Sequence, residues 1–289
     1  MLKQLGHHES SEPVILPAEL LRGLQEAKKR LLEAKYPITT EFGRYSRLWD
    51  YMAVNPGFWG KAGNPDVLEV GPGASMEVNM GGFPEHYPNV KAALENAAPG
   101  IFTFHRSSEP IEIHSASRAA GKNIRLTIAD ANPDILYIAE HQPYILAGDG
   151  PPFMNTMPSA EERSALRRHY SRVLKDADKT IPLQDVVTAM RRENIEFMQA
   201  ENVSIVFPSN EYRNSVSFKK ADIIEDTTDF SGLDLLISLG DVGIENLERM
   251  CEFASKALKV GGHWITNRGE AKGFEREVDI GDVTILRKK

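Results

Sequence analysis

A short apolar run that ends in glycines constrains the fold of this chain more than any other feature. It covers residues 67–73 and reads VLEVGPG. Such a run is typical of a buried strand in a parallel sheet that turns sharply at its end. Parallel strands need long crossover connections, and these are usually helices. The segment therefore predicts an α/β protein.

Later strand-like runs fit the same plan. They lie at residues 124–130 (IRLTIAD), 216–224 (VSFKKADII), 233–240 (LDLLISLG) and 263–266 (HWIT). Before the last run, apolar residues recur at helical spacing from Leu247 to Leu258, and Gly261 and Gly262 stop that helix. The C-terminal residues 274–289 read as a closing β-hairpin around Gly281. We expect a doubly wound, Rossmann-like and mostly parallel sheet with an antiparallel hairpin.

Two helical segments are expected in addition to the sheet and its connecting helices. Residues 1–62 read as an N-terminal helical cap, because an amphipathic helix follows Pro17 and an aromatic-rich segment follows it. Residues 63–289 then form the main domain, with a helical insertion at about 148–202 and a long connection at 76–123. The insertion either closes a site as a lid or only supports the sheet, and the sequence leaves both open.

Composition narrows the class of protein. The net charge of -7 argues against a broad nucleic-acid surface, which would need many Lys and Arg side chains. One cysteine, Cys251, excludes an intramolecular disulfide, and its helical position favours packing over nucleophilic chemistry. No segment resembles a signal peptide or a membrane span, so we expect a cytoplasmic protein.

The residues at the predicted strand ends form the candidate site, because ligands bind beyond the carboxyl ends of the strands in an open parallel sheet. A dinucleotide fingerprint is not met, since Met76 stands where its third glycine belongs. Glu69 lies inside an apolar strand and needs a cationic or donor partner, which an ammonium group on a ligand would supply. The strand-end positions are residues 71–75, 130–131, 222–223, 238–241 and 267.

At this point VLEVGPGAS resembles the first motif of class I S-adenosylmethionine-dependent methyltransferases, which has an acidic residue two positions before G-x-G. Ser75 departs from the further glycine that the family usually has. The helix leading to LKVGGHW and the final GDVTILRK also resemble the end of the family's domain. The resemblance covers roughly residues 65–147 and 203–289, and it implies a seven-stranded sheet and S-adenosylmethionine as the cofactor.

The resemblance also implies roles for individual residues. The loop of Gly71, Pro72 and Gly73 would lie along the methionine and ribose of the cofactor, next to Glu69. Asp130, followed by Ala131, would hold the ribose hydroxyls. From the residues alone, Asp130 could instead cap the following helix.

The remaining cofactor positions follow the third and fourth strands. Asp222 and Ile223 would contact adenine, although Asp222 could equally be a solvated strand end. Ser238 would complete the cofactor site after the fourth strand.

Methyl transfer depends mostly on positioning and on exclusion of water, and a general base is optional. Asp241, His141 and His169 are candidates for such a base. A cap and an insertion favour an enclosed pocket and hence a small-molecule acceptor. A peptide or protein acceptor and a non-catalytic cofactor-binding protein are the alternatives. We expect no metal and no nucleic-acid partner, and the sequence does not predict the oligomeric state.

Overall fold

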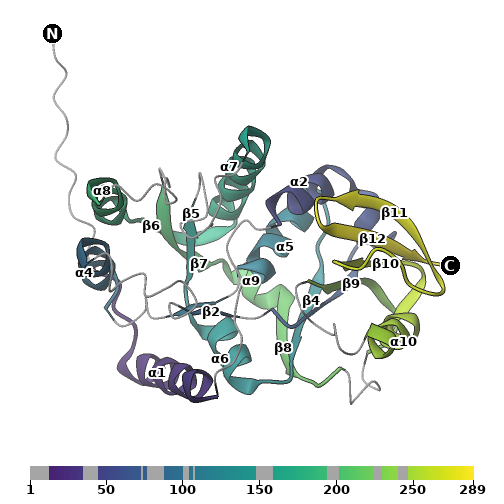
Figure 1. The fold of residues 1–289 in the computed structure, drawn as a ribbon, viewed down its shortest axis with the longest axis horizontal. Coiled ribbons are helices and arrows are strands. Elements are labelled where there is room, and N and C mark those ends of the chain that lie inside the picture. Colours follow the sequence, from purple (N-terminus) through teal and green to yellow (C-terminus); the bar gives the residue numbers. More distant parts are fainter. Residues whose placement is uncertain are drawn as a thin grey trace, which may run out of the picture.

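The computed structural model describes residues 13–34, 45–72, 74–76, 88–99, 104–106, 108–147, 159–193, 202–223, 230–239 and 247–289. Its largest element is a seven-stranded sheet of order β11-β12-β10-β9-β1-β4-β8 (Figure 1). The strands are β1 (Asp66–Val70), β4 (Arg125–Asp130), β8 (Val216–Lys220), β9 (Leu233–Ser238), β10 (Leu258–Thr266), β11 (Phe274–Ile280) and β12 (Val283–Lys288).

The pairing of these strands confirms the predicted fold class. Strands β8, β4, β1, β9 and β10 are parallel to their neighbours, and β12 pairs antiparallel with both β10 and β11. The chain runs from β1 outward to β4 and β8 and then returns to β9 on the other side of β1. The order of connection therefore reverses between β1 and β9, which is where doubly wound folds bind ligands.

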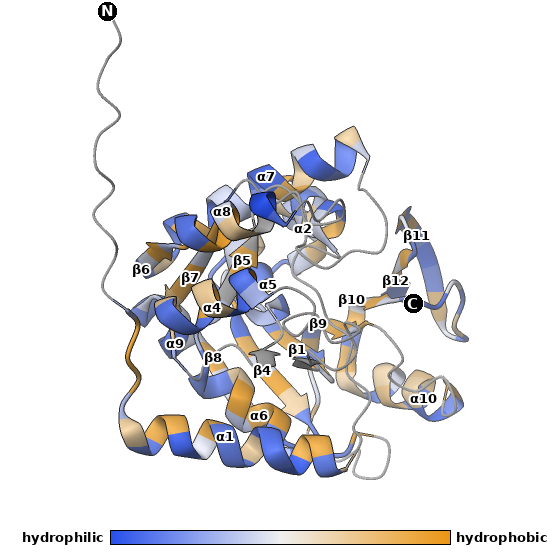
Figure 2. Ribbon diagram, turned by 60° about the vertical axis from the view of Figure 1, so that its left-hand side comes forward, coloured by the Kyte–Doolittle hydropathy of each residue, from blue (hydrophilic) through white to orange (hydrophobic). Residues whose placement is uncertain are grey.

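Helices cover both faces of this sheet. Helices α2 (Ser46–Val54), α5 (Glu109–Ala119) and α6 (Pro133–His141) contribute to the core on one face, which includes Trp49, Trp59 and Ile128. Helix α10 (Leu247–Ala257) packs on the other face with Leu68 and Trp264. The short 3-10 helix η1 (Pro56–Trp59) continues α2 into the same core. Figure 2 shows apolar residues concentrated along the strands between these layers.

The glycine pair at residues 261–262 lies inside a strand, whereas we expected it to end a helix. Helix α10 ends at Ala257, and β10 begins directly afterwards instead of after the glycine pair. The strand register shifts between Leu258 and His263, and Gly261 in this stretch has a φ of 77° that favours glycine. The glycines thus form a bulge inside a strand rather than the stop of a helix.

The N-terminal helices join the main sheet at separate places. Helix α1 (Ala18–Glu33) packs on α6, where Leu24, Leu31 and Ile138 are buried together. A side chain at Gly23 would collide with the hydroxyl of Tyr137. Helix α2 instead shares the core of the sheet, so the division at residue 62 stays a prediction.

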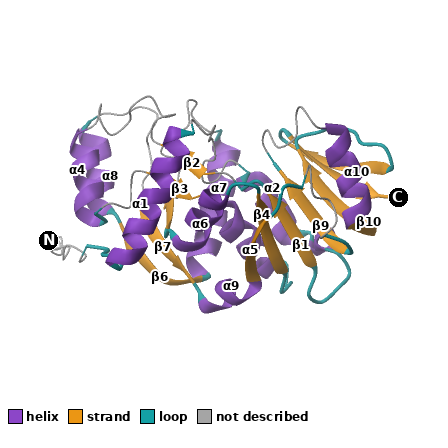
Figure 3. Cartoon of the chain, turned by 90° about the horizontal axis from the view of Figure 1, so that it is seen from below, coloured by secondary structure: helices purple, strands orange, loops and turns teal. Residues whose placement is uncertain are grey.

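The chain between α6 and β8, which includes the predicted insertion at about 148–202, contains a sheet as well as helices. Its elements are β5 (Tyr144–Ala147), α7 (Ala160–Lys175), β6 (Ala177–Pro182), α8 (Gln184–Arg192), β7 (Val203–Pro208) and α9 (Asn210–Ser215). Strands β5, β7 and β6 form an antiparallel sheet, which lies away from the hairpin end of the large sheet (Figure 3). The prediction assigned only helices to residues 148–202, and it assigned no strand to the apolar run Val203–Pro208 that follows them.

The long connection after β1 contains short strands as well as helices. A strand follows the glycine turn directly: β2 (Ala74–Met76) pairs with β3 (Phe104–Arg106). Helix α4 (Pro88–Ala97) lies between them in the chain and packs with α8 and β7 in a second core. The helix that leads into β4 is α5, which begins only at Glu109. None of the helices in the described ranges is long and apolar enough to cross a membrane.

The buried side chain of Asp234 connects three strands at the amino edge of the sheet. Its Oδ2 accepts hydrogen bonds from the backbone N–H of Asp66 and from Nζ of Lys259, both at 3.0 Å. We predict that Asp234→Ala lowers the free energy of unfolding by about 1 to 3 kcal/mol, because the buried N–H loses its acceptor. Urea denaturation measures this loss. Asp178→Ala removes an exposed ion pair with Arg213 and should cost less than about 1 kcal/mol; equal losses would contradict the prediction.

Candidate functional site

Three strand ends meet at the carboxyl edge of the large sheet. The backbone N–H of Gly71 donates to the carbonyl of Ala129 at 2.9 Å, which joins the end of β1 to β4. The N–H of Ala221 donates to the carbonyl of Asp130 at 3.1 Å, which joins the ends of β4 and β8. These bonds bring together the predicted positions at Gly71, Asp130 and Asp222.

The turn after β1 has the geometry that the glycines suggested. Gly71 has a φ of 65°, a left-handed conformation that residues with a Cβ rarely adopt. Pro72 follows it and is buried. Gly73 lies outside the described residues. A glycine at this turn leaves the backbone open to close approach by a ligand, next to the end of β4.

Asp130 is the most informative side chain of the site. It is 6% exposed, and its Oδ1 accepts the backbone N–H of Asn132 at 2.8 Å. Burial raises the pKa of Asp130 to about 6, because the charged form loses solvation. Among the described residues, Oδ2 accepts no hydrogen bond, so it remains available to a donor on a ligand.

Asn132, and not Asp130, caps helix α6. The Oδ1 atom of Asn132 accepts the N–H of Asp134 at 2.9 Å, as an N-cap residue does. The alternative in which Asp130 caps this helix is therefore wrong. Asp130 instead closes the turn that precedes the cap.

The other predicted cofactor positions differ in how exposed they are and in whether their polar atoms are already bonded. Ile223 is buried and provides apolar surface, whereas Asp222 and Ala131 are exposed at the strand ends. Ser238 ends β9 and is buried, but its Oγ accepts a hydrogen bond from Nε1 of Trp264 at 2.8 Å. The hydroxyl of Ser238 is thus already engaged within the core.

Acidic side chains are concentrated near this edge. Glu69, next to the last residue of β1, is 1% exposed, and Glu109 and Glu112 are buried in the first turn of α5. The pairing of β2 with β3 returns the chain toward the glycine turn, since Ala74 lies opposite Arg106. The start of α5 follows β3 directly, so its acidic turn lies near the same edge as Asp130. The sequence signal was present in SSEPIE, but the prediction did not assign a helix there.

The structure does not bring the histidine candidates to the strand ends. His141 is the last residue of α6, which begins beside Asp130, so about 12 Å of helix separates them. Its Nδ1 lies 2.9 Å from the carbonyl of Tyr137. His169 is fully buried between helices, with Nε2 3.2 Å from Oε1 of Glu112. Asp241 lies outside the described residues.

Most aromatic residues of the predicted cap belong to the core instead of a pocket wall. Trp49 is fully buried, and Phe58 packs against Tyr51 and His263. Tyr45, which precedes α2, belongs to the same core as Trp49. It is 4% exposed.

An ionic cluster fixes the inserted helix α7 against α2, a feature that the sequence did not reveal. The carboxylate of Asp50 accepts hydrogen bonds from Arg168, at 2.6 and 2.9 Å, and from Arg172. These guanidinium groups hold the pKa of Asp50 below its usual value, against the opposing effect of burial. The insertion is therefore anchored to a helix of the main core.

The raised pKa of Asp130 predicts that the stability of the fold decreases as pH rises from about 4 to about 6. A free aspartate loses its proton near pH 4, but Asp130 in the folded protein keeps it until about pH 6. Across that window the folded state binds more protons, so stability falls as pH rises. Asp130→Asn keeps the acceptor for Asn132 and has no such proton. We expect the wild type to lose about 1 to 3 kcal/mol relative to the variant between pH 4 and 6.5.

Urea denaturation at half-unit pH intervals measures this difference. A difference that stays constant with pH would show that Asp130 ionises normally in the folded protein.

Comparisons with known proteins give only low similarity. No family model matches the chain, and no curated protein matches it. A TehB-like SAM-dependent methyltransferase from Corynebacterium glutamicum has 12% identity and a TM-score of 0.35, over 94% of this chain and 100% of that chain. A methyltransferase from Geobacter sulfurreducens has 12% identity and a TM-score of 0.32, over 95% and 91%.

The [4+2]-cyclase SpnF has 13% identity and a TM-score of 0.32, over 88% of this chain and 61% of that chain. Likenesses of this size do not decide an activity, so the strand order itself identifies the architecture. The chain has the doubly wound α/β fold, closed by an antiparallel hairpin, that its resemblance to class I S-adenosylmethionine-dependent methyltransferases implies.

Proposed function

We propose that this protein binds S-adenosylmethionine at the carboxyl ends of β1, β4 and β8 and transfers its methyl group to a small-molecule acceptor. The observation that carries the proposal is the buried Asp130, which ends β4 directly beside the left-handed turn at Gly71. A carboxylate in this position accepts hydrogen bonds from the two vicinal hydroxyls of a ribose. The glycine turn leaves room for the adjoining part of the cofactor.

The charge of the site supports this cofactor over a nicotinamide dinucleotide. Glu69, Glu109 and Asp130 are buried near this edge, and the chain carries a net charge of -7. A pyrophosphate would bring two negative charges to these carboxylates. S-adenosylmethionine brings a sulfonium and an ammonium group, and buried carboxylates stabilise nearby cations. Ile223 offers apolar surface beside the same strand end, where adenine would pack.

The cofactor supplies a methyl group on a positively charged sulfur, so the protein has to position an acceptor and exclude water. Helix α7, anchored by Asp50 to α2, is the described part of the insertion that is suited to enclose the acceptor. Asp241, which follows β9 in the sequence, is the proposed base for an acceptor that must lose a proton. His141 has no part in the proposal, because α6 places it away from the strand ends.

The cofactor assignment predicts both selectivity and its loss on mutation. Calorimetric titration should show binding of S-adenosylmethionine or S-adenosylhomocysteine and none of NAD. Asp130→Ala should weaken that binding about tenfold to a hundredfold, because two hydrogen bonds to a charged acceptor are lost. The cap of α6 remains, since Asn132 provides it. Below pH 6 the wild-type affinity should also fall, as Asp130 takes up a proton.

Asp134→Ala is the matched control. It removes the same charge four residues later, where the carboxylate bonds to Arg30 on α1, and should leave affinity unchanged. NAD binding without binding of either sulfur compound would overturn the assignment. Binding of S-adenosylmethionine without a methylated product from a broad acceptor panel would instead indicate a non-catalytic protein.

If the acceptor site is enclosed, ligand binding should change the amide exchange rates of the helices around it. If α2 and α7 close over the site, saturating S-adenosylhomocysteine should slow amide exchange at residues 45–54 and 159–170. Hydrogen exchange followed by mass spectrometry measures this, with the hairpin β11–β12 as the internal reference. Equal rates with and without the ligand would leave α7 as a support of the sheet.

A further inference from the structure

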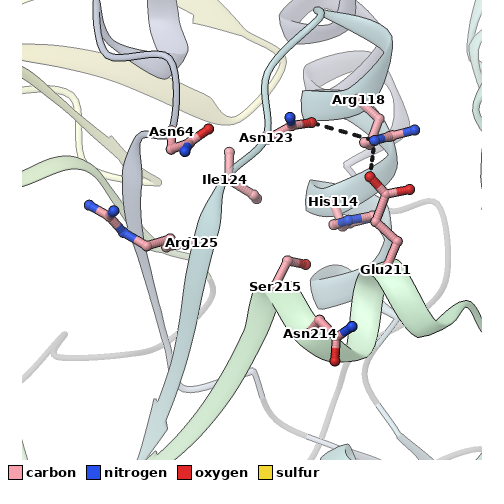
Figure 4. Close-up of a pocket in the computed structure, with 9 residues that line it drawn as sticks. All are labelled: Asn64, His114, Arg118, Asn123, Ile124, Arg125, Glu211, Asn214 and Ser215. Atoms are coloured by element: carbon pink, nitrogen blue, oxygen red, sulfur yellow. Dashed lines mark hydrogen bonds and ion pairs between the residues drawn. The ribbon is translucent and has the colours of Figure 1, made fainter.

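A cavity opens at the amino edge of the sheet, opposite the strand ends just described. Its volume is about 540 Å³, within the range of small-molecule sites. It lies where α5 ends, β4 begins and α9 leads into β8 (Figure 4). The lining includes the amides of Asn64, Asn123 and Asn214. The cavity shares no lining residue with the proposed cofactor site.

Two opposite charges from distant parts of the chain meet at this cavity. Arg118 on α5 forms an ion pair with Glu211 on α9, and NH1 of Arg118 also donates to Oδ1 of Asn123 at 3.4 Å. The side chains of Arg118 and Glu211 are 37% and 56% exposed. Pairs this exposed add little to stability. They can therefore separate at low cost and offer both charges to a ligand.

A buried histidine lies beside this pair. His114 is 3% exposed, and burial together with the charge of Arg118 lowers its pKa to about 4. The ring is therefore neutral near pH 7. Its Nδ1 makes no hydrogen bond within the described part of the chain, the carboxylate of Asp176 being 3.8 Å away. His114 thus offers a ring nitrogen for hydrogen bonding in the cavity without adding charge.

The charges that face the cavity cancel. Arg125 also contributes to the lining, but its guanidinium points away from Arg118 and makes two hydrogen bonds to Asp66, at 2.6 and 2.7 Å (Figure 4). A simple anion would be attracted to Arg118 but repelled by the carboxylate of Glu211. A simple cation would be attracted to Glu211 but repelled by the guanidinium of Arg118. A ligand carrying both charges close together satisfies both side chains at once.

We propose that this cavity binds a small zwitterion, a free α-amino acid or a compound with the same pair of groups, between Arg118 and Glu211. The ligand's carboxylate accepts hydrogen bonds from the guanidinium of Arg118, and its ammonium donates to the carboxylate of Glu211. Guanidinium and carboxylate pairs of this kind form strong, directional hydrogen bonds. The three asparagine amides around the cavity suit a polar ligand side chain.

The test uses the full-length protein and the twenty common L-amino acids as probes, each titrated to 10 mM and followed by the NMR signals of His114. We expect at least one of them to shift these signals in a saturable manner. The α-amide of the best probe lacks the carboxylate, and its N-acetyl form lacks the ammonium. Both should bind at least tenfold more weakly. Absence of binding by all twenty, or equal binding of the N-acetyl form, overturns the proposal.

Variants separate the two charges. Arg118→Gln and Glu211→Gln should each weaken binding of the best probe about tenfold. Arg276→Gln is the matched control, because it removes an arginine from a similarly exposed pair with Asp279 on the hairpin. It should leave binding unchanged. Stronger binding by Glu211→Gln would indicate an anion site and overturn the proposal, as would equal effects of Arg118→Gln and Arg276→Gln.

Discussion

The parallel pairing of β1 with β4 is the interaction on which the rest of the structure depends. Polar contacts hold the pair at both ends. At the amino edge, the side chain of Arg125 on β4 donates hydrogen bonds to the carboxylate of Asp66 on β1. At the carboxyl edge, the N–H of Gly71 donates to Ala129. Because side chains alternate along a strand, a shift of one residue would move every apolar group to the opposite face. The fixed register therefore determines which helices each strand meets and where its last polar residue lies.

The two edges of this sheet present different electrostatics. The carboxyl edge gathers buried carboxylates, with Asp130 held in a setting that raises its pKa to about 6. The amino edge has balanced exposed pairs around a neutral histidine. Strand β4 runs from one edge to the other, from Arg125 to Asp130. One strand thus contributes both to the proposed cofactor site and to the cavity proposed to bind a zwitterion.

Helix α5 shows how the additions to the sheet are integrated. All residues from Glu109 to Ser117 are buried, because the helix packs against the sheet on one side and against α2 and α7 on others. Oε1 of its buried Glu112 lies 3.2 Å from Nε2 of the fully buried His169 on α7. The inserted helix is thereby fixed to the helix that leads into β4, in addition to its contact with α2.

The sequence by itself determined where the main strands lie along the chain, the closing hairpin and the strand-end positions, because short apolar runs and glycine turns are local signals. Residues 67–73 and 124–130 carried enough of that signal to predict both β1 and β4 and the polar residue that ends β4. Only the tertiary structure decided that Asn132 caps α6, that His141 lies at the far end of that helix, and that β2 follows the glycine turn. It also revealed the antiparallel sheet of the insertion and the meeting of Arg118 with Glu211. These features depend on pairing between residues far apart in the chain, and no local pattern of side chains specifies such partners.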